Sequence, residues 1–253
     1  MEKVFDMGRD KTITKVLLYS GGMDSWLCRQ LWKPDKCLYI NVGSVYSAEE
    51  IERLDNGVDY AELPLGKYER KDNYVVPLRN LYFAMLATNE YQEGDLEICL
   101  GATVGDRPQV FKDKSDEWAA KTSDLLTYLY SRQSWNPVPR KINVVLPYVK
   151  WSKAQMLWQY IKNGGDIETA MQQTFSCHSP HNDHECWNCK PCFRKFVAFY
   201  QNGYIFDDDI KRQMLKYAEQ NVMCDWASWS YERGCEADEV LHTVKELRDE
   251  FGV

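Results

Sequence analysis

The stretch Lys15–Ser25, KVLLYSGGMDS, decides how the first half of the chain is expected to fold. Its apolar run Lys15–Ser20 predicts a buried strand, and Met23–Trp32 predicts a helix that Pro34 ends. The two glycines between them can adopt positive φ angles and let a ligand approach the backbone. Because free N–H groups at a helix N-terminus favour an anion, this strand–loop–helix stretch predicts a phosphate site.

Similar strand–helix alternation continues through the first half of the sequence. It predicts an α/β fold, a Rossmann-like parallel sheet with helices on both faces, in which ligands bind at the carboxyl ends of the strands. Residues 1–150 are expected to form this domain, and residues 151–253 a mostly helical C-terminal region. Further strands are predicted at Cys37–Val42, Leu96–Ala102 and Ile142–Pro147, with a short strand at Asn73–Pro77. Further helices are predicted at Ala48–Leu54, Arg79–Tyr91, Lys114–Tyr130, from Ser152 to Gly164, Phe193–Tyr200, Asp207–Glu219 and Glu236–Phe251.

Composition narrows the classes of function. The chain has 253 residues and a formal net charge of −7, which argues against a general nucleic-acid binder but is compatible with a small anionic ligand. The charged start MEKVFDMGRDKTITK lacks the apolar core of a signal peptide, and no apolar run approaches the ~20 residues of a membrane span. We therefore expect a cytoplasmic protein that binds neither nucleic acid nor membranes directly.

Four of the nine cysteines lie close together in the second half: Cys177, Cys186, Cys189 and Cys192. In a reducing compartment such a group indicates metal rather than disulfides, and four thiols with CxxC spacing suit one tetrahedral zinc ion. We expect a structural zinc site, because the loop has few apolar residues with which to fold. An iron–sulfur cluster, a site with one histidine ligand, and four unrelated buried cysteines are the alternatives. The histidines of this loop are His178, His181 and His184.

The string Ser20–Ser25, SGGMDS, resembles the SGGxDS signature of the PP-loop ATP pyrophosphatases, which release AMP and pyrophosphate from ATP. The alternative is a plain strand–turn–helix junction in which the serines and the aspartate only cap the helix. The GxxxxGK[ST] string of kinases and GTPases does not occur. The resemblance implies a PP-loop fold of the HUP type, with Asp24 either capping the helix or helping to hold Mg²⁺. The ATP-binding residues that it implies are Ser20, Gly21, Gly22, Met23, Asp24 and Ser25.

Together, the loop and the cysteines resemble the 7-cyano-7-deazaguanine synthase (QueC) family, in which an N-terminal SGGxDS is followed by SC…CxxCxxC…R. The resemblance runs from about Lys15 to Phe199 and leaves the tail, residues 203–253, unaccounted for. Further strings that are similar to those of the family are Pro77–Asn80 (PLRN), Gly101–Asp106 (GATVGD), Pro147 and Lys153 in LPYVKWSKAQM, Thr174–Cys177 (TFSC) and Cys192–Phe196 (CFRKF).

This resemblance implies an ATP-dependent C–N ligase. It would adenylate the carboxylate of 7-carboxy-7-deazaguanine and admit ammonia, giving the nitrile with release of AMP and pyrophosphate. The resemblance also suggests a homodimer. Asp24, Lys153 and Asp106 are the candidate catalytic residues, and Arg79 is a candidate phosphate contact. Plainer interpretations are that Lys153 is an exposed lysine in a first helical turn, Asp106 a helix cap and Arg79 a surface residue.

One segment departs from the family pattern. Where the family carries a YPDCRxEF-like string, this chain has Phe111–Trp118, FKDKSDEW. Asp113 and Glu117 are retained as candidate contacts for the N–H edge of the base, whereas Lys114 and a serine replace Cys and Arg. Lys112 or Lys114, the latter a candidate substrate contact, would supply the missing charge, although a lysine is a point charge rather than a fork. The alternative is a polar loop that leads into a helix capped by Asp113.

Two other functions stay open at this point. A relative with an altered substrate segment would stop at the amide or join the adenylated acid to another amine. A zinc-stabilised nucleotide-binding module would regulate a partner without catalysis, although an intact SGGMDS string argues against that. In the tail, Trp226, Trp229 and Tyr231 are expected either to pack on their own chain or to form a subunit contact, since aromatic residues are enriched in interface cores.

Overall fold

The computed structural model describes residues 12–72, 75–177 and 184–253. At its centre lies a parallel sheet of five strands in the order β3-β2-β1-β4-β5, which confirms the predicted fold class. The strand order reverses between β1 and β4. A ligand crevice is expected at such a point, beyond the carboxyl ends of these two strands. The strands are β1 (Ile13–Leu18), β2 (Lys36–Asn41), β3 (Val58–Glu62), β4 (Asp95–Leu100) and β5 (Ile142–Val145).

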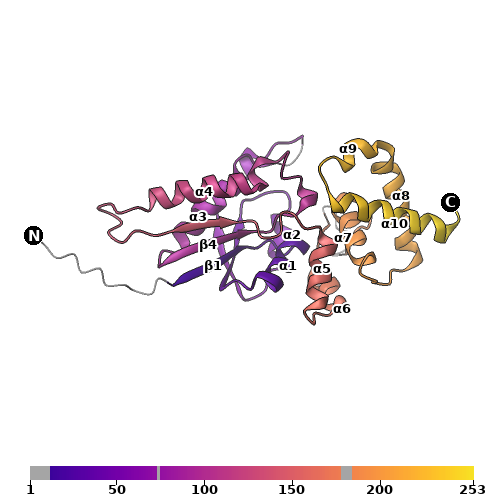
Figure 1. The fold of residues 1–253 in the computed structure, drawn as a ribbon, viewed down its shortest axis with the longest axis horizontal. Helices are drawn as coiled ribbons and strands as arrows, with labels where there is room; N and C mark the ends of the chain where they lie inside the picture. The colour runs from indigo at the N-terminus through magenta and orange to yellow at the C-terminus, as the bar shows by residue number, and fades with distance from the viewer. Residues whose placement is uncertain (1–11, 73–74, 178–183) are drawn as a thin grey trace, which may run out of the picture.

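Helices make up most of the remaining described chain, and those of the C-terminal region gather at one end of the molecule (Figure 1). The α-helices are α1 (Met23–Trp32), α2 (Ser47–Ile51), α3 (Arg79–Glu90), α4 (Asp116–Leu129), α5 (Lys153–Lys162), α6 (Ile167–Gln173), α7 (Lys190–Tyr200), α8 (Asp208–Asn221), α9 (Trp226–Ser230) and α10 (Cys235–Phe251). Short 3₁₀ helices are η1 (Gly66–Tyr68), η2 (Val104–Asp106), η3 (Lys112–Lys114) and η4 (Met223–Asp225).

The two faces of the sheet are covered by different sets of helices. Neighbouring residues of a strand point to opposite faces. Leu17 of β1 accordingly joins an apolar cluster with Leu27 of α1, whereas Val16 joins a second cluster with Ala84 of α3 and Leu126 of α4. The expected cover of helices on both faces is thus confirmed.

β5 is an edge strand, and hydroxyl groups of α4 satisfy its outer side. The Thr127 hydroxyl accepts from the N–H of Ile142 and donates to its carbonyl, each at 3.0 Å. Ser123 Oγ accepts from the N–H of Val144 at 2.8 Å. An open strand edge would offer these backbone groups to another chain. α4 therefore closes this edge of the sheet against pairing.

The C-terminal helices share one core with the first face of the sheet. Phe193 and Phe196 of α7, Met214 of α8 and Leu247 of α10 are fully buried in the cluster that contains Leu27 of α1. This apolar cluster runs across residue 150. The division of the chain at that residue remains a prediction about sequence organisation, and the two parts are packed together here.

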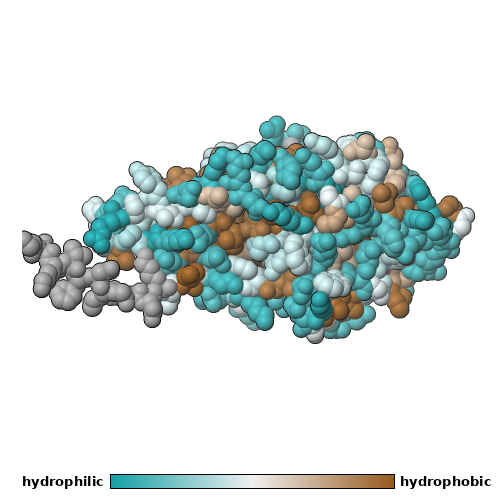
Figure 2. Space-filling model, in the orientation of Figure 1, coloured by the Kyte–Doolittle hydropathy of each residue, from teal (hydrophilic) through white to brown (hydrophobic). Residues whose placement is uncertain are grey.

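Aromatic residues of the tail pack mainly within their own chain. The rings of Trp226 and Trp229 stack with centroids 5.7 Å apart and lie against the shared core, whereas Tyr231 is 56% exposed. This supports packing on the same chain, and the homodimer remains a prediction. Figure 2 shows a mostly hydrophilic face with small groups of apolar residues. No helix in the described part of the chain combines the length and apolar character needed to cross a membrane.

The first turn of α5 ties the tail to the body of the protein. Ser152 caps this helix as predicted: its Oγ accepts from the N–H of Gln155, and its own N–H donates to the Gln155 side chain, both at 3.1 Å. The Ser152 hydroxyl also donates to the carboxyl group of Glu239 in α10. Burial, together with the charges of Glu236 and Asp238, raises the pKa of Glu239 from 4.5 to about 7.

We expect Glu239→Gln to change the pH dependence of stability. The folded state prefers the protonated carboxyl of Glu239. The contribution of this group to the free energy of unfolding is therefore complete below the unfolded pKa near 4.5 and is lost as the pH rises through the folded pKa of about 7. The variant should therefore be more stable than the parent at pH 8, by about 1–2 kcal/mol in the free energy of unfolding, and match it at pH 4. Thermal unfolding across this range measures the difference. A constant difference between parent and variant at every pH would contradict the assignment.

Candidate active site and metal centre

The SGGMDS loop, residues Ser20–Ser25, joins β1 to α1 at the carboxyl edge of the sheet. Gly21 has a φ of +74°, a conformation that favours glycine. Gly22 is the N-cap of α1, and no side-chain cap hydrogen bond is made there. Ser25 Oγ donates to the Gly22 carbonyl at 3.0 Å. The loop therefore has the form of an anion cradle.

The end of β4 packs tightly against this loop. A Cβ added to Gly101 would lie 3.3 Å from the backbone nitrogen of Ser25, closer than most real contacts. The GATVGD segment therefore passes directly beside the start of α1, where the strand order reverses. Met23, in contrast, directs its side chain into the core and is 1% exposed, so that only its backbone is positioned to face a ligand.

Two predicted catalytic residues meet at the start of α1. Lys153, the first residue of α5, places its Nζ against the carboxylate of Asp24. The lysine side chain is 9% exposed and that of Asp24 22%. The interpretation of Lys153 as an exposed surface lysine is therefore wrong, because the sheet edge and the C-terminal helices cover it. A buried cation now stands beside the SGGMDS loop.

The third predicted catalytic residue, Asp106, lies at the end of η2. Its Oδ2 accepts from the backbone N–H of Thr103 at 2.9 Å, so it does cap this turn. Its Oδ1 also lies 3.4 Å from Lys114 Nζ and 3.6 Å from Arg194 Nη1. Burial alone would raise the pKa of this carboxyl, but the charges of Lys114, Arg194 and Lys153 outweigh it and hold the pKa well below its usual range. Asp106 is therefore a permanent anion among cations.

The predicted substrate segment divides into residues near Asp106 and residues away from it. Lys114 faces Asp106, and Asp113 Oδ2 accepts from Asn80 Nδ2 at 2.9 Å. Glu117 is exposed on α4, where it pairs with Lys121 at 2.6 Å. The structure thus joins Lys114 to the predicted catalytic residues and leaves Glu117 facing solvent.

The start of α4 and the position of Arg79 both differ from the plainer expectations. Ser115 caps α4 by accepting from the Trp118 N–H at 3.2 Å, so the alternative in which Asp113 caps this helix is wrong. Arg79 begins α3 and is only half-buried, with its guanidinium 5.8 Å from the Phe83 ring centre. Its role as a phosphate contact remains a prediction.

Two residues without an assigned role lie beside the loop glycines. The Arg53 guanidinium lies 3.7 Å from the centre of the Phe175 ring. A Cβ on Gly21 would be 3.9 Å from the Arg53 carbonyl oxygen, and a Cβ on Gly22 would be 3.7 Å from that of Phe175. Phe175 could be found from the sequence because it lies in the TFSC string, whereas Arg53 lies in no recognised motif. This stacked pair forms one wall of the phosphate loop.

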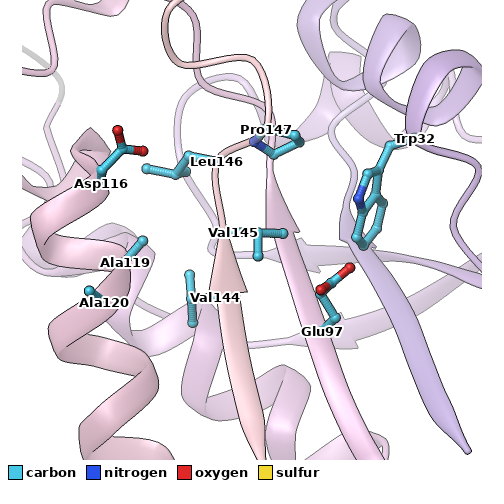
Figure 3. A pocket seen from close by; sticks show the side chains of 9 residues that line it. All are labelled: Trp32, Glu97, Asp116, Ala119, Ala120, Val144, Val145, Leu146 and Pro147. Atoms are coloured by element: carbon cyan, nitrogen blue, oxygen red, sulfur yellow. The ribbon is translucent and has the colours of Figure 1, made fainter.

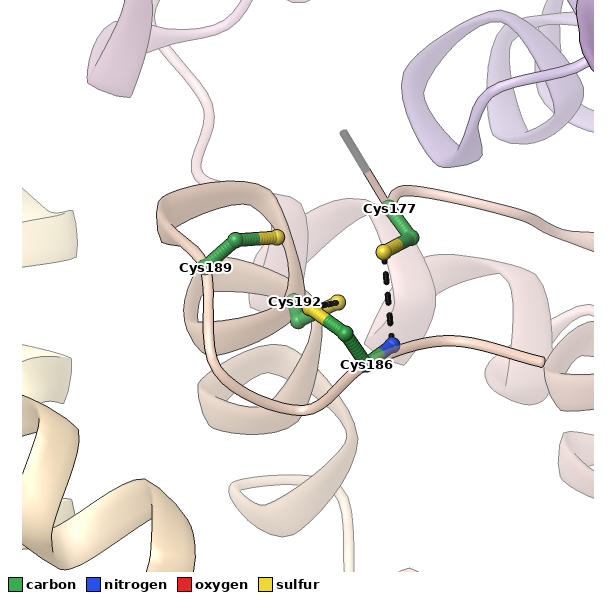
Figure 4. A group of neighbouring side chains, drawn as sticks. All are labelled: Cys177, Cys186, Cys189 and Cys192. Atoms are coloured by element: carbon green, nitrogen blue, oxygen red, sulfur yellow. Dashed lines mark hydrogen bonds between the residues drawn. The ribbon is translucent and has the colours of Figure 1, made fainter. Parts of the chain in front are cut away.

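The predicted cysteine group comes together. The sulfur atoms of Cys177, Cys186, Cys189 and Cys192 lie within 4.8 Å of one another (Figure 4). Around one zinc ion, Zn–S bonds of about 2.3 Å place the sulfurs about 3.8 Å apart. An iron–sulfur cluster binds its cysteines through separate iron atoms and so holds the sulfurs farther apart. Four thiols this close fit a single tetrahedral ion. His184 is exposed outside the group, and His178 and His181 lie outside the described residues.

A buried ion pair supports the cysteine loop. Lys195 Nζ lies 2.9 Å from Glu185 Oε2 and donates to the Thr174 carbonyl at 2.6 Å. The other oxygen of Glu185 accepts from the N–H of Ser176 at 2.7 Å. Burial lowers the pKa of Lys195, although the Glu185 carboxylate opposes this effect. The loop is therefore held against α6 and α7 by charge as well as by its cysteines.

Two hollows lie on the surface away from the SGGMDS residues. One of about 460 Å³ straddles β5, between Ala119 of α4 and Trp32 of α1 (Figure 3). The other, of about 400 Å³, is lined by Phe175, His184 and Lys195 among others and adjoins the cysteine loop. Neither hollow is lined by Asp24, Lys153 or Asp106, so neither is assigned to the chemistry. The smaller hollow is the one next to the SGGMDS loop, because Phe175 lines it and also packs beside Gly22.

The parallel sheet, the SGGMDS loop and the cysteine group together define a protein of the PP-loop fold class. The family model described as "Queuosine biosynthesis protein QueC" matches residues 54–203, more than half of the chain. The chain therefore belongs to the QueC family.

The relatives are distant. The 7-cyano-7-deazaguanine synthase of Methanobrevibacter smithii is 26% identical over 124 residues, 49% of this chain and 49% of that protein. The synthase of Sulfolobus acidocaldarius is 26% identical over 128 residues, 51% of this chain and 25% of that protein. The alignments thus span half or less of these relatives. Among solved structures, the U34-tRNA thiolase NcsA from Methanococcus maripaludis with its [4Fe-4S] cluster gives a TM-score of 0.33 and 16% identity, covering 95% of this chain and 74% of that one. A likeness of this size bears on neither the metal nor the function.

Proposed function

We propose that the protein is an ATP-dependent C–N ligase that activates a 7-deazaguanine carboxylate. A carboxylate oxygen of the acid attacks the α-phosphorus of ATP, and the bond to pyrophosphate breaks. Ammonia then attacks the acyl carbon, AMP leaves, and an amide remains. A second ATP adenylates the amide oxygen and releases pyrophosphate, and loss of AMP and the two amide protons gives 7-cyano-7-deazaguanine. Membership of the QueC family supports the substrate class.

One observation carries this proposal: the buried Lys153–Asp24 pair beside an amide cradle at the point where strand order reverses. The backbone of Ser20–Ser25 would hold the phosphates, and Lys153 would neutralise the charge that develops on the α-phosphate. Fixed charges in a site shielded from water stabilise such a transition state strongly. Asp24 orients the lysine and would provide a carboxylate for the Mg²⁺ that accompanies ATP.

The acid would bind on the other side of Lys153, near Asp106. A carboxylate accepts hydrogen bonds from the N–H edge of a guanine-like base, and Asp106 remains ionised for that purpose. Lys114, 3.4 Å from Asp106, would meet the carboxylate of the acid or a phosphate. Asp113, Glu117 and Arg79 would make secondary contacts, since Asp113 accepts from Asn80 and Glu117 pairs with Lys121.

We propose zinc as the resident metal, bound by Cys177, Cys186, Cys189 and Cys192. The spacing of their sulfurs fits a single ion with four protein ligands, which leaves no position for a substrate. The metal would stabilise the loop that carries Phe175 to the SGGMDS residues. Its role would therefore be structural.

The test is a mass analysis of the products. Purified protein is incubated with ATP, Mg²⁺, ammonium and 7-carboxy-7-deazaguanine. We expect AMP, pyrophosphate and the nitrile. ATP binding without acid-dependent pyrophosphate release would favour the non-catalytic regulatory module instead.

A second candidate function follows from the segment that departs from the family. Lys112–Lys114 forms η3 beside Asp106, with Lys114 in place of the family's cysteine and Ser115 in place of its arginine. An altered acid site suits an enzyme that stops at the amide or joins the adenylated acid to another amine. In the same incubation, an accumulating amide would favour this function. A conjugate formed only when another amine is added would do so as well.

Lys114→Ala tests whether this segment binds the acid. Loss of the charge should weaken binding by on the order of 1.5–3 kcal/mol, the usual range for a hydrogen bond to a charged group. Titration of parent and variant with 7-carboxy-7-deazaguanine, followed by calorimetry, measures the change. Glu117→Ala provides the comparison, because its carboxylate faces solvent and Lys121. If both variants bind the acid as tightly as the parent, the segment does not recognise it.

A further inference from the structure

The tail contributes buried charged residues to the candidate active site. Glu236 lies in the first turn of α10, and Arg233 just before it. Their side chains are 5% and 2% exposed. They belong to residues 204–253, which lie beyond the part of the chain that the family model matches. The site formed by the SGGMDS loop and the matched residues therefore has an additional wall.

Glu236 holds the guanidinium of Arg194 with both oxygens. Arg194 Nε lies 2.7 Å from Oε1 and Nη2 lies 2.8 Å from Oε2. Such a two-pronged pair fixes the plane of the guanidinium as well as its position. Burial would raise the pKa of Glu236, but the charge of Arg194 outweighs it and keeps the pKa below its usual range. The tail thus holds Arg194 by a charged clamp.

The remaining end of Arg194 points toward the predicted catalytic residues. Nη1 lies 3.6 Å from Asp106 Oδ1, too far for a hydrogen bond, and Nη2 donates to Thr103 Oγ1 at 3.2 Å. This ion pair with Asp106 brings Nη1 closer than any other guanidinium nitrogen of Arg194 to the predicted catalytic carboxylate. With its other donors engaged by Glu236 and Thr103, Arg194 presents this end to the space beside Asp106.

The GATVGD segment is shaped around the same contact. A Cβ on Gly105 would lie 1.5 Å from Glu236 Oε2 and 2.2 Å from Arg194 Nη2. The Gly105 carbonyl also accepts from Arg233 Nη1 at 2.8 Å, and the same nitrogen lies 3.2 Å from Glu236 Oε1. The absence of a side chain at position 105 therefore lets the tail carboxylate approach the turn that carries Asp106.

We propose that Glu236 is a positioning residue of the active site, supplied by the tail, which holds Arg194 away from Asp106. Without the Glu236 carboxylate, Asp106 is the nearest anion to Arg194, and the guanidinium would close the remaining 3.6 Å onto it. The Asp106 carboxylate would then pair with Arg194 and move away from Lys114 and from the bound acid. In its kinetic test this inference rests on the proposed function.

The experiment compares Glu236→Gln with the parent in acid-dependent pyrophosphate release. We expect KM for the acid to rise at least tenfold and kcat to fall less. The combined Glu236→Gln and Arg194→Gln variant should be no worse than Arg194→Gln alone, because Glu236 acts through that arginine. Glu246→Gln, on the same helix beside exposed His242, is the matched control and should keep parent kinetics. Parent kinetics in Glu236→Gln, or independent losses in the double variant, would overturn the proposal.

Two further measurements separate a positioning role from a folding defect and from failure of the proposed function. If Glu236→Gln does not fold, Gly105→Ala takes its place in the experiment. This variant displaces the Arg194–Glu236 pair without removing a charge and should give the same rise in KM for the acid. A crystal structure of either variant should show Arg194 in hydrogen-bond contact with Asp106. If the parent does not turn over the acid but Arg194 moves, only the proposed function fails. If the arginine stays in place in the variant, the positioning role is wrong.

Discussion

Lys153→Met is expected to lower acid-dependent pyrophosphate release at least about 100-fold, the usual cost of removing a preorganised charge that stabilises a transition state. The methionine keeps an unbranched side chain beside Asp24, one atom shorter than lysine, and removes the ammonium group with its charge. Because Lys153 would act mainly on the α-phosphate in the transition state, the loss should fall on kcat more than on KM. Steady-state kinetics with ATP and the acid measure this.

Lys162→Met is the matched control for this change. Lys162 lies at the end of the same helix, exposed and over the Trp158 ring, and its replacement should leave the kinetics unchanged. Asp24→Ala should resemble Lys153→Met, since it removes the partner that orients the lysine. If Lys153→Met keeps full activity while folding normally, the PP-loop chemistry assigned to this pair is wrong.

Cys189→Ser should have the largest effect on stability. The parent is expected to contain about one zinc ion per chain, and the variant much less. Loss of a structural metal belongs to the changes that cost about 4 kcal/mol or more. For a chain of this size that corresponds to roughly 10 °C in the unfolding temperature. Elemental analysis and thermal unfolding measure both effects.

Cys224→Ser separates loss of the metal from loss of a thiol. Cys224 is an exposed cysteine outside the group, so its replacement should change neither metal content nor stability. Stoichiometric iron in the parent would replace the zinc assignment with an iron–sulfur cluster. A parent free of metal that unfolds at the same temperature as Cys189→Ser would remove the metal site altogether.

Elements with strong local patterns could be predicted from the sequence. Met23–Trp32 is a helix over the residues predicted, and Ser152 and Gln155 form the expected capping box. β3, α6 and α9 were not predicted, nor were the short 3₁₀ helices. The strand expected at Asn73–Pro77 is wrong over residues 75–77, which form no strand, and its first two residues lie outside the described chain. β3, VDYAE, is an edge strand with only Ala61 buried, so it lacks the apolar run that marked the others. α6, Ile167–Gln173, spans two turns capped by Asp166, too short for a helical period to stand out.

The candidate site could be predicted where one continuous string carries it, and not where distant segments meet. The SGGMDS loop and the four cysteines were visible as strings. The contacts of Arg194 with Glu236 join residues of separate helices, and no local sequence pattern predicts them. Burial of Lys153 likewise depends on how the C-terminal helices pack, and for that reason its exposure could not be decided from the sequence.

The most direct test of the account follows an oxygen atom. 7-Carboxy-7-deazaguanine labelled with ¹⁸O in its carboxylate is incubated with the protein, ATP, Mg²⁺ and ammonium, and the AMP is weighed. If the carboxylate attacks the α-phosphorus, the acyl–oxygen bond breaks when ammonia enters, and AMP carries the label. AMP without the label, or ADP and phosphate in place of AMP and pyrophosphate, would contradict adenylation of the acid by this site.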